Sequence, residues 1–165
     1  MHCVAFFGCA LVGVVLAGAS RTLALAADEP RPPILSSSES QITDEMIGRK
    51  YPPMLLTIIA EDPKYAFSQR SPVMVGGGFG EGGHNTYRFL NALRGPNGEV
   101  VHYARIGTCC KFRTPNSPFG ESALLEVYEI TYAGEKPKRL YFNWYDSGEP
   151  MIPVGLSAEK PPVHD

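Results

Sequence analysis

The segment LLEVYEITYAGEKPKRLYFNWY, residues 124–145, decides the fold class of this 165-residue chain. Its two ends, LLEVYEITY and KRLYFNWY, are rich in the β-branched and aromatic residues that strands favour. The short stretch AGEKP between them has the composition of a tight connection. Parallel neighbours would need a crossover of about a dozen residues, so this connection predicts two adjacent antiparallel strands.

A second hairpin is predicted upstream, in TYRFLNALRGPNGEVVHYARIG, residues 86–107. The stretches TYRFLNALR and EVVHYARIG both have strand-like composition, and GPNG between them is a turn signal. Pro96 presets the first turn dihedral, Asn97 suits the next position, and Gly98 can adopt a positive φ. Together the two hairpins predict an antiparallel meander in the C-terminal part of the chain.

Two short helices are expected before the meander. One begins after Thr43, whose hydroxyl can cap it. The other begins at Pro53 in PMLLTIIAED, where apolar residues have helical spacing, although the β-branched Ile58 and Ile59 would also suit a strand. We therefore expect an α+β fold, mostly an antiparallel β meander of hairpins with one or two short N-terminal helices, as a single globular domain over residues 42–160.

The N-terminus predicts export. The run CVAFFGCALVGVVLAGAS carries no charge and is followed by Ala-Leu-Ala, a small-x-small cleavage pattern, so residues 1–26 are expected to be a signal peptide. An uncleaved run would instead anchor the chain in the membrane through residues 3–20. A polar Pro/Ser-rich stretch follows at once, which favours cleavage and predicts a flexible tether over residues 27–41. The mature domain is then periplasmic or secreted.

The charge composition narrows the range of partners. Lys and Arg number 15 against 17 Asp and Glu, a net charge of −2, so no basic patch favours nucleic acid. Contact with a membrane is expected only if the signal peptide remains uncleaved. No cofactor is expected. The expected partner is an unidentified small ligand or an envelope protein.

The glycine-rich stretch GFGEGG, residues 78–83, matches the dinucleotide fingerprint G-x-G-x-x-G. That fingerprint must open a helix within a strand–helix–strand unit that also supplies an acidic partner for the ribose. We expect a hairpin after it, so the glycines are interpreted as a mobile loop between strands. The functional alternative is a lid over a site. The candidate ligand-binding residues are Gly78, Gly80, His84, Arg105 and Asp146.

Aromatic residues are concentrated in the hairpin of residues 124–145, where they suggest either ligand stacking or a sheet core. Cross-strand aromatic pairs are common in sheet cores, which favours the second interpretation. Alternation places Tyr128 and Tyr132 on one face with Leu124 and Ile130, and Trp144 on one face with Leu140 and Phe142.

Four ordered blocks, PKYAFSQRSPVMVGGG, RFLNALRGPNGEVVHYARIGTCCKF, LLEVYEITY and LYFNWYDSGEPMIPVGL, together resemble a family of small exported bacterial proteins of unknown function. The resemblance covers residues 61–156. The sequence departs from the family pattern at Ala66 and Phe67, where Gly and Tyr are expected, and at Trp144, where Met is common. Some members carry the name 2-dehydro-3-deoxyphosphooctonate aldolase. That name denotes a (β/α)₈ barrel of about 250 residues, so antiparallel hairpins do not support this activity.

The adjacent pair Cys109 and Cys110 leaves three interpretations open; the only other cysteines, Cys3 and Cys9, leave with the signal peptide. Neighbouring side chains in a strand face opposite ways, so one thiol could be buried, and alternation from Val100 points Cys110 inward. An oxidising compartment favours instead a vicinal disulfide, strained because adjacent Cα atoms lie only about 3.8 Å apart. The pair is expected at the end of its strand.

The third interpretation of the pair is chemical, with a thiol as nucleophile or both thiols as metal ligands. The spacing typical of a metal site is missing, so no metal is expected. The candidate catalytic residues are Cys109 with His84 or His102 as the base. Function thus remains divided between an exported non-enzymatic domain that binds a small ligand, peptide or envelope partner, and a thiol-dependent or hydrolytic enzyme. An enzyme needs the thiol and a histidine within hydrogen-bond reach.

Overall fold

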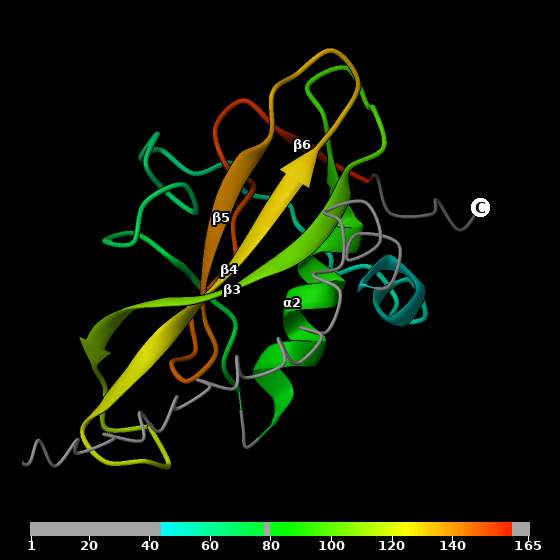
Figure 1. Ribbon diagram of the computed structural model, residues 1–165. Coiled ribbons are helices and arrows are strands. Elements are labelled where there is room, and N and C mark those ends of the chain that lie inside the picture. The colour runs from blue at the N-terminus through cyan, green and yellow to red at the C-terminus, as the bar shows by residue number, and fades with distance from the viewer. Residues whose placement is uncertain (1–43, 78–79, 160–165) are drawn as a thin grey trace, which may run out of the picture. The chain divides into compact units, whose positions relative to one another are not determined.

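The centre of the molecule is an antiparallel meander of three consecutive strands. The computed structural model describes residues 44–77 and 80–159. The meander consists of β3 (His102–Arg113), β4 (Ser122–Thr131) and β5 (Lys138–Asn143), as Figure 1 shows. The strand pair predicted from LLEVYEITY and KRLYFNWY is therefore confirmed, and so is the α+β class.

A short strand at the far edge completes the main sheet. β1 (Val73–Met74) pairs with β5 in parallel, which gives the strand order β1-β5-β4-β3. β3 therefore lies at the opposite edge, with one strand neighbour. The predicted signal peptide, tether and Thr43 cap lie outside the described residues.

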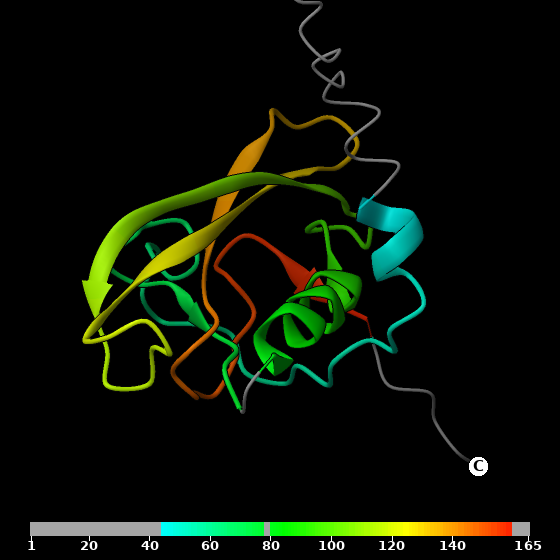
Figure 2. The ribbon, with the colours of Figure 1, turned by 60° about the horizontal axis from the view of Figure 1, so that its bottom comes forward.

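A helix replaces the strand predicted over residues 86–92. This helix, α2 (Glu81–Ala92), covers one face of the main sheet, as Figure 2 shows. The stretch has strand-like composition, but Thr86, Phe89 and Leu90 also have helical spacing, and all three are buried. Packing decides between the two, because the ring of Phe89 meets the ring of Phe142 edge-on, with centroids 5.6 Å apart.

The predicted GPNG turn is confirmed, although it joins shorter strands than expected. Gly98 has φ of +89°, and its amide donates to the Gly95 carbonyl at 3.0 Å. Within the stretch predicted as the first strand, residues 86–94, only β2 (Leu93–Arg94) is extended, and it pairs antiparallel with β6 (Ser157–Ala158) in a separate small sheet. The turn therefore links α2 to β3 through a brief strand.

The first predicted helix is present, and the described residues begin within it. The prediction of a second helix is wrong. A short helix occupies residues 44–48, whereas the stretch after Pro53 contains no helix. Instead, Ile59 forms a parallel bridge to Ile152, and the Ala60 amide donates to the Ile152 carbonyl at 2.9 Å. The β-branched residues suit this extended path. No helix in the described ranges is long and apolar enough to cross a bilayer.

The alternation counted from Val100 is wrong at the start of β3. Val101 and Tyr103 are buried there, whereas Val100 is exposed. Leu124, expected in the core, is also exposed, while Tyr128, Ile130 and Tyr132 are buried as predicted. Two register shifts between β3 and β4, after Arg105 and after Cys109, lie further along β3, and each changes the face that the later β3 residues occupy.

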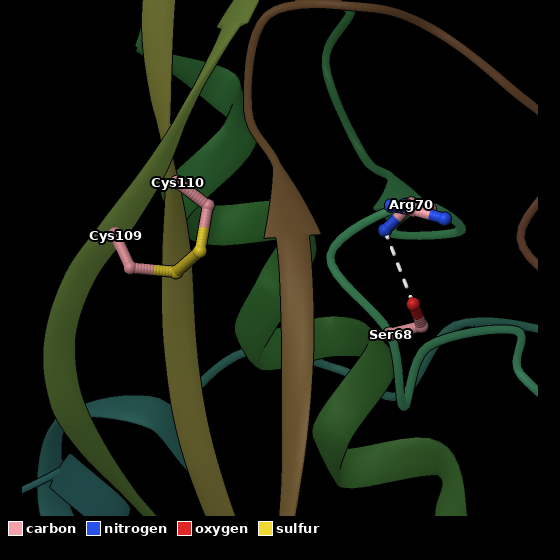
Figure 3. The surroundings of a disulfide bond; sticks show 4 residues. All are labelled: Ser68, Arg70, Cys109 and Cys110. Carbon is pink, nitrogen blue, oxygen red and sulfur yellow. Dashed lines mark hydrogen bonds between the residues drawn. A yellow bond between two sulfur atoms is a disulfide. The ribbon is translucent and has the colours of Figure 1, made fainter.

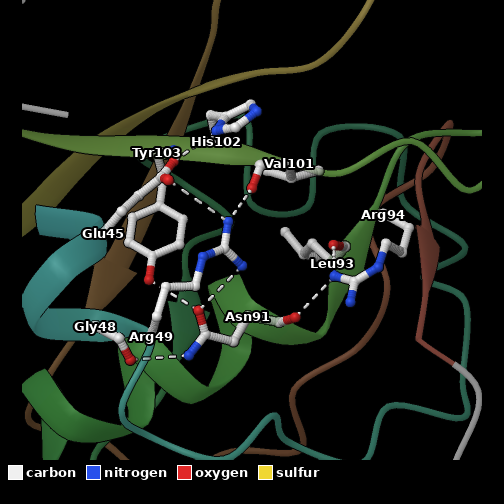
Figure 4. Close-up of polar contacts among 9 residues, drawn as sticks. All are labelled: Glu45, Gly48, Arg49, Asn91, Leu93, Arg94, Val101, His102 and Tyr103. Atoms are coloured by element: carbon white, nitrogen blue, oxygen red, sulfur yellow. Dashed lines mark hydrogen bonds and ion pairs between the residues drawn. The ribbon is translucent and has the colours of Figure 1, made fainter. Parts of the chain in front are cut away.

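A buried amide joins segments that lie far apart in the sequence (Figure 4). The Asn91 Nδ2 donates to the Gly48 carbonyl at 2.9 Å, and its Oδ1 accepts from the Tyr103 hydroxyl at 2.8 Å. The Nδ2 also donates to the Tyr51 carbonyl at 2.8 Å. Burial raises the pKa of Tyr103 to about 12, so this hydroxyl remains a donor. Asn91 thus ties α2 both to the N-terminal segment and to β3.

Candidate functional site

A cavity of about 760 Å³ lies at the N-terminal end of α2. Four parts of the chain meet around it: the loop after the first helix, the glycine-rich start of α2, the segment that follows β5, and residues 115–119. Six rings line the cavity, those of Tyr51, His84, Tyr87, Phe119, Trp144 and Tyr145. Its volume falls within the range of small-molecule sites, about 300–1,000 Å³.

The glycines of α2 allow Trp144 to lie directly against the helix. A Cβ added at Gly82 would come within 2.5 Å of the Trp144 Cβ, so this position needs a residue without a side chain. The indole Nε1 of Trp144 donates to the Thr86 hydroxyl at 2.8 Å, and that hydroxyl donates to the Gly82 carbonyl. The sequence motif GEGG therefore has a packing role.

Three of the lining rings form a stack. The ring of Tyr51 lies between those of His84 and Tyr87, with centroids 4.8 and 5.7 Å away. Tyr87 also meets the buried ring of Tyr128 edge-on at 6.3 Å. Burial raises the pKa of Tyr87, so its hydroxyl remains neutral at ordinary pH. The stack is therefore continuous with the core through the contact of Tyr87 with Tyr128.

The wall loop, residues 114–121, forms another side of the cavity and is anchored to Asp146. The Asp146 Oδ1 accepts hydrogen bonds from the Thr114 hydroxyl and from Asn116 Nδ2, and its Oδ2 accepts one from Asn143 Nδ2 at 2.7 Å. Burial opposes ionisation of Asp146, but these three hydrogen bonds outweigh it and lower the pKa of the carboxyl. An ionised carboxylate therefore fixes the loop.

Ionised side chains are excluded from the lining of this cavity. Among the described residues that line it, none is Asp, Glu, Lys or Arg. Neutral polar groups are supplied by Asn116, Ser117 and Ser147. Across residues 44–77 and 80–159, no group of three or more His, Cys, Asp or Glu side chains is arranged to hold a metal ion.

The residues predicted as ligand-binding are only partly brought together. Gly80 and His84 line the cavity, and Asp146 lies behind its wall loop. Gly78 lies outside the described residues. Arg105 is engaged elsewhere, since its Nε donates to the carboxylate of Glu126 at 2.7 Å.

The two candidate catalytic histidines have separate surroundings. His84 lies in the ring stack of the cavity, whereas His102 is exposed on β3, with its Nδ1 3.0 Å from a carboxylate oxygen of Glu45. Cys109 is not among the residues that line the cavity. The cavity therefore contains one of the predicted catalytic residues, His84.

The vicinal cysteines are joined inside β3 rather than at its end (Figure 3). Their Sγ atoms lie 2.07 Å apart, at disulfide distance, and their Cα atoms are 3.7 Å apart. Both residues are half-buried, so the predicted arrangement of one buried and one exposed thiol is not found. The strand continues past them to Arg113.

The helix required by the dinucleotide fingerprint is present, contrary to the expected hairpin, but the rest of the unit is missing. After α2 the chain enters β2, which pairs with β6 in the small sheet and not beside β1. A dinucleotide unit needs two parallel strands of one sheet joined by the helix. Gly82 is accounted for by its close packing against Trp144 instead, and Gly80 by its positive φ of +82°.

Comparison with profiles of protein families, with curated proteins and with solved structures found no match to this chain. The site therefore has to be interpreted from its own geometry. Sequence reasoning did not identify Tyr51, Tyr87, Phe119, Trp144 or Tyr145 as lining residues. One signal was available in the sequence, since Phe119 is an aromatic residue within the otherwise polar stretch TPNSPFG. In the structure its side chain is 87% exposed.

Proposed function

We propose that this protein is an exported, non-enzymatic binding domain whose cavity takes a neutral ligand with a flat face, such as a sugar ring or another small cyclic molecule. The observation that carries the proposal is the combination of six lining rings with the absence of ionised side chains among the described lining residues. Aromatic rings offer large rigid faces for contact, which suits a flat ligand.

The polarity of the lining supports a neutral ligand over a charged one. A charged ligand loses its hydration on entry and needs an opposite charge in the site as compensation. Asn116, Ser117 and Ser147 can instead satisfy hydroxyl or amide groups through neutral hydrogen bonds. The nearby carboxylate of Asp146 is already occupied by the wall loop.

The alternative, a thiol-dependent or hydrolytic enzyme using Cys109 with His84 or His102, has less support. A cysteine nucleophile reacts as a thiolate, which a disulfide-bonded Cys109 does not supply. His102 pairs with Glu45 at the surface, and His84 is held in the ring stack. These contacts favour binding over covalent catalysis.

The proposal is tested by fluorescence, because Trp144 is the single tryptophan of the chain and lines the cavity. The protein is titrated with neutral saccharides and neutral cyclic compounds, and separately with their anionic and cationic counterparts. We expect saturable changes in emission with the neutral set, and affinity about fivefold lower after Tyr51→Ala, since an aromatic contact contributes on the order of 1 kcal/mol.

A matched control is Tyr141→Ala, which removes a ring that does not line the cavity and should leave affinity unchanged. The proposal fails if no neutral compound gives a saturable change. It also fails if charged compounds bind as well as neutral ones.

Export is part of the proposal and has its own test. The uncharged leader and the small-x-small pattern support cleavage after residue 26. The intact mass of protein recovered from its native compartment should correspond to a chain beginning at Ala27. A mass that includes the leader would instead support anchoring through residues 3–20.

A further inference from the structure

We propose that the Cys109–Cys110 disulfide controls the cavity, so that its reduction releases the wall loop and opens the site. The biological meaning of this control rests on the proposed function, because it regulates the same cavity. The structural basis is that the disulfide lies in β3, four residues before Thr114, where the wall loop begins.

The disulfide holds a bulge in β3. Cys109 lies opposite Leu125 and Lys111 opposite Leu124, so Cys110 is the extra residue of the bulge. Cys110 has φ of +60°, in the left-handed region that residues with a Cβ disfavour. The bond to its neighbour restrains Cys110 in this conformation.

The bulge sets the register of the strand that leads into the wall loop. Beyond it, Phe112 lies opposite Ala123 and its ring is 6.3 Å from that of Tyr145, a lining residue. Thr114 then reaches Asp146 and is buried. A shift of one residue in the pairing of β3 with β4 would turn these side chains to the other face of the sheet. Loss of the bulge would therefore separate Phe112 from Tyr145 and Thr114 from Asp146.

The position of the disulfide also makes it accessible to a reductant. Both cysteines are half-buried, and β3 is an edge strand of its sheet. A dithiol reductant breaks the S–S bond by transferring two electrons; both cysteine sulfurs become thiols, and the dithiol becomes a disulfide. Such a reductant is the co-reactant that this control requires.

The test compares oxidised protein with protein treated with dithiothreitol, by hydrogen exchange measured with mass spectrometry. We expect amides in residues 111–121 to exchange about tenfold faster after reduction, because this segment opens locally. Amides of β5 serve as the internal reference and should not change. As a second readout, acrylamide should quench Trp144 about twofold more efficiently once the wall loop is released.

Two variants isolate the disulfide. Cys109→Ser with Cys110→Ser should match the reduced protein with or without dithiothreitol. Cys109→Ser with Cys110→Gly should exchange more slowly than the double serine variant, because glycine adopts positive φ without a steric penalty. The proposal is overturned if oxidised and reduced protein give the same exchange and the same quenching, or if dithiothreitol changes the double serine variant as well.

Neither readout needs a ligand, so failure of the saccharide titration would leave this test valid. Conversely, a neutral ligand that binds oxidised and reduced protein with equal affinity would preserve the proposed function and refute redox control.

Discussion

Asp146 illustrates how a single residue can determine the shape of a site that it does not line. Its carboxylate accepts hydrogen bonds from Thr114 and Asn116 of the wall loop and from Asn143 at the end of β5. Hydrogen bonds to an ionised acceptor are stronger than those between neutral groups. The position of the wall loop therefore depends on the ionisation of Asp146.

Replacing Asp146 with Asn should lower the free energy of unfolding by about 1 kcal/mol at pH 7, because one hydrogen-bond acceptor becomes a donor that faces other donors. The pKa of Asp146 lies below its ordinary value of 3.8. Its contribution is therefore complete above that value and is lost as pH falls through the lower folded-state pKa. Urea melts at several pH values should show the difference between wild type and variant shrinking below about pH 4.

The matched control is Glu149→Gln. Glu149 is an exposed carboxylate in the same turn region, so its substitution should leave the free energy of unfolding almost unchanged. A difference for Asp146→Asn that stayed constant down to pH 2 would show that ionisation of this carboxyl is not what holds the loop.

Gly98 was predictable at the residue scale, and its substitution tests the turn. Its φ of +89° is disfavoured for residues with a Cβ, although an added Cβ would meet no atom within 4 Å. Gly98→Ala should therefore cost on the order of 1 kcal/mol through backbone conformation alone. Denaturant melts provide the measurement, and a change near zero would mean that the turn adopts another conformation.

At the scale of elements, α2 shows why composition misled the prediction. The aromatic and apolar residues of TYRFLNA suit a strand, and the following GPNG turn favours a hairpin. The helix forms because its buried face packs on the sheet, with Phe89 against Phe142. Tertiary contacts commonly override intrinsic propensity in this way.

Two adjacent glycines in α2 should respond in opposite ways to alanine. At Gly82 an added Cβ would lie 2.5–2.7 Å from Trp144 atoms, including its backbone, so Gly82→Ala should destabilise the protein by about 1–3 kcal/mol. At Gly83 the nearest contact would be 3.7 Å, to the indole, so Gly83→Ala should stabilise the helix by about 0.5–1 kcal/mol. Thermal and urea melts measure both changes. Equal effects at the two positions would contradict the observed packing of Trp144.

Across the whole molecule, Asn91 connects segments that the sequence keeps far apart. Its amide donates to the carbonyls of Gly48 and Tyr51 and accepts from the hydroxyl of Tyr103. The hydrogen bonds to Gly48 and Tyr103 are buried (Figure 4). Buried polar groups that lose their partners are strongly unfavourable. The network therefore stabilises one arrangement of the N-terminal segment, α2 and β3.

Asn91→Ala should lower the free energy of unfolding by about 2–4 kcal/mol, because it leaves several buried groups without partners. Tyr103→Phe is the matched control, since it removes one of these hydrogen bonds while keeping the ring, and should cost about 1 kcal/mol. Chemical denaturation measures both variants. A loss for Asn91→Ala no larger than that for Tyr103→Phe would contradict the role of Asn91 as a shared anchor.

Local chemistry in the sequence alone determined the β4–β5 hairpin, the Gly98 turn and the α+β class, because strand propensity, short connections and turn residues act over a few neighbouring positions. The same local reasoning placed Cys109 and Cys110 together and favoured a bond between them. It misjudged α2, which forms because its apolar face packs on the sheet, and the start of β3, where Val101 and Tyr103 are buried in place of Val100.

Only the tertiary structure decided the cavity. Tyr51, His84, Phe119 and Trp144 come from separate segments, and nothing in their local spacing places them around one space. The same holds for Asp146, whose hydrogen bonds cross from the turn after β5 to the wall loop. Such contacts form between residues distant in sequence, and they depend on how helix and sheet pack, which no short window of sequence contains.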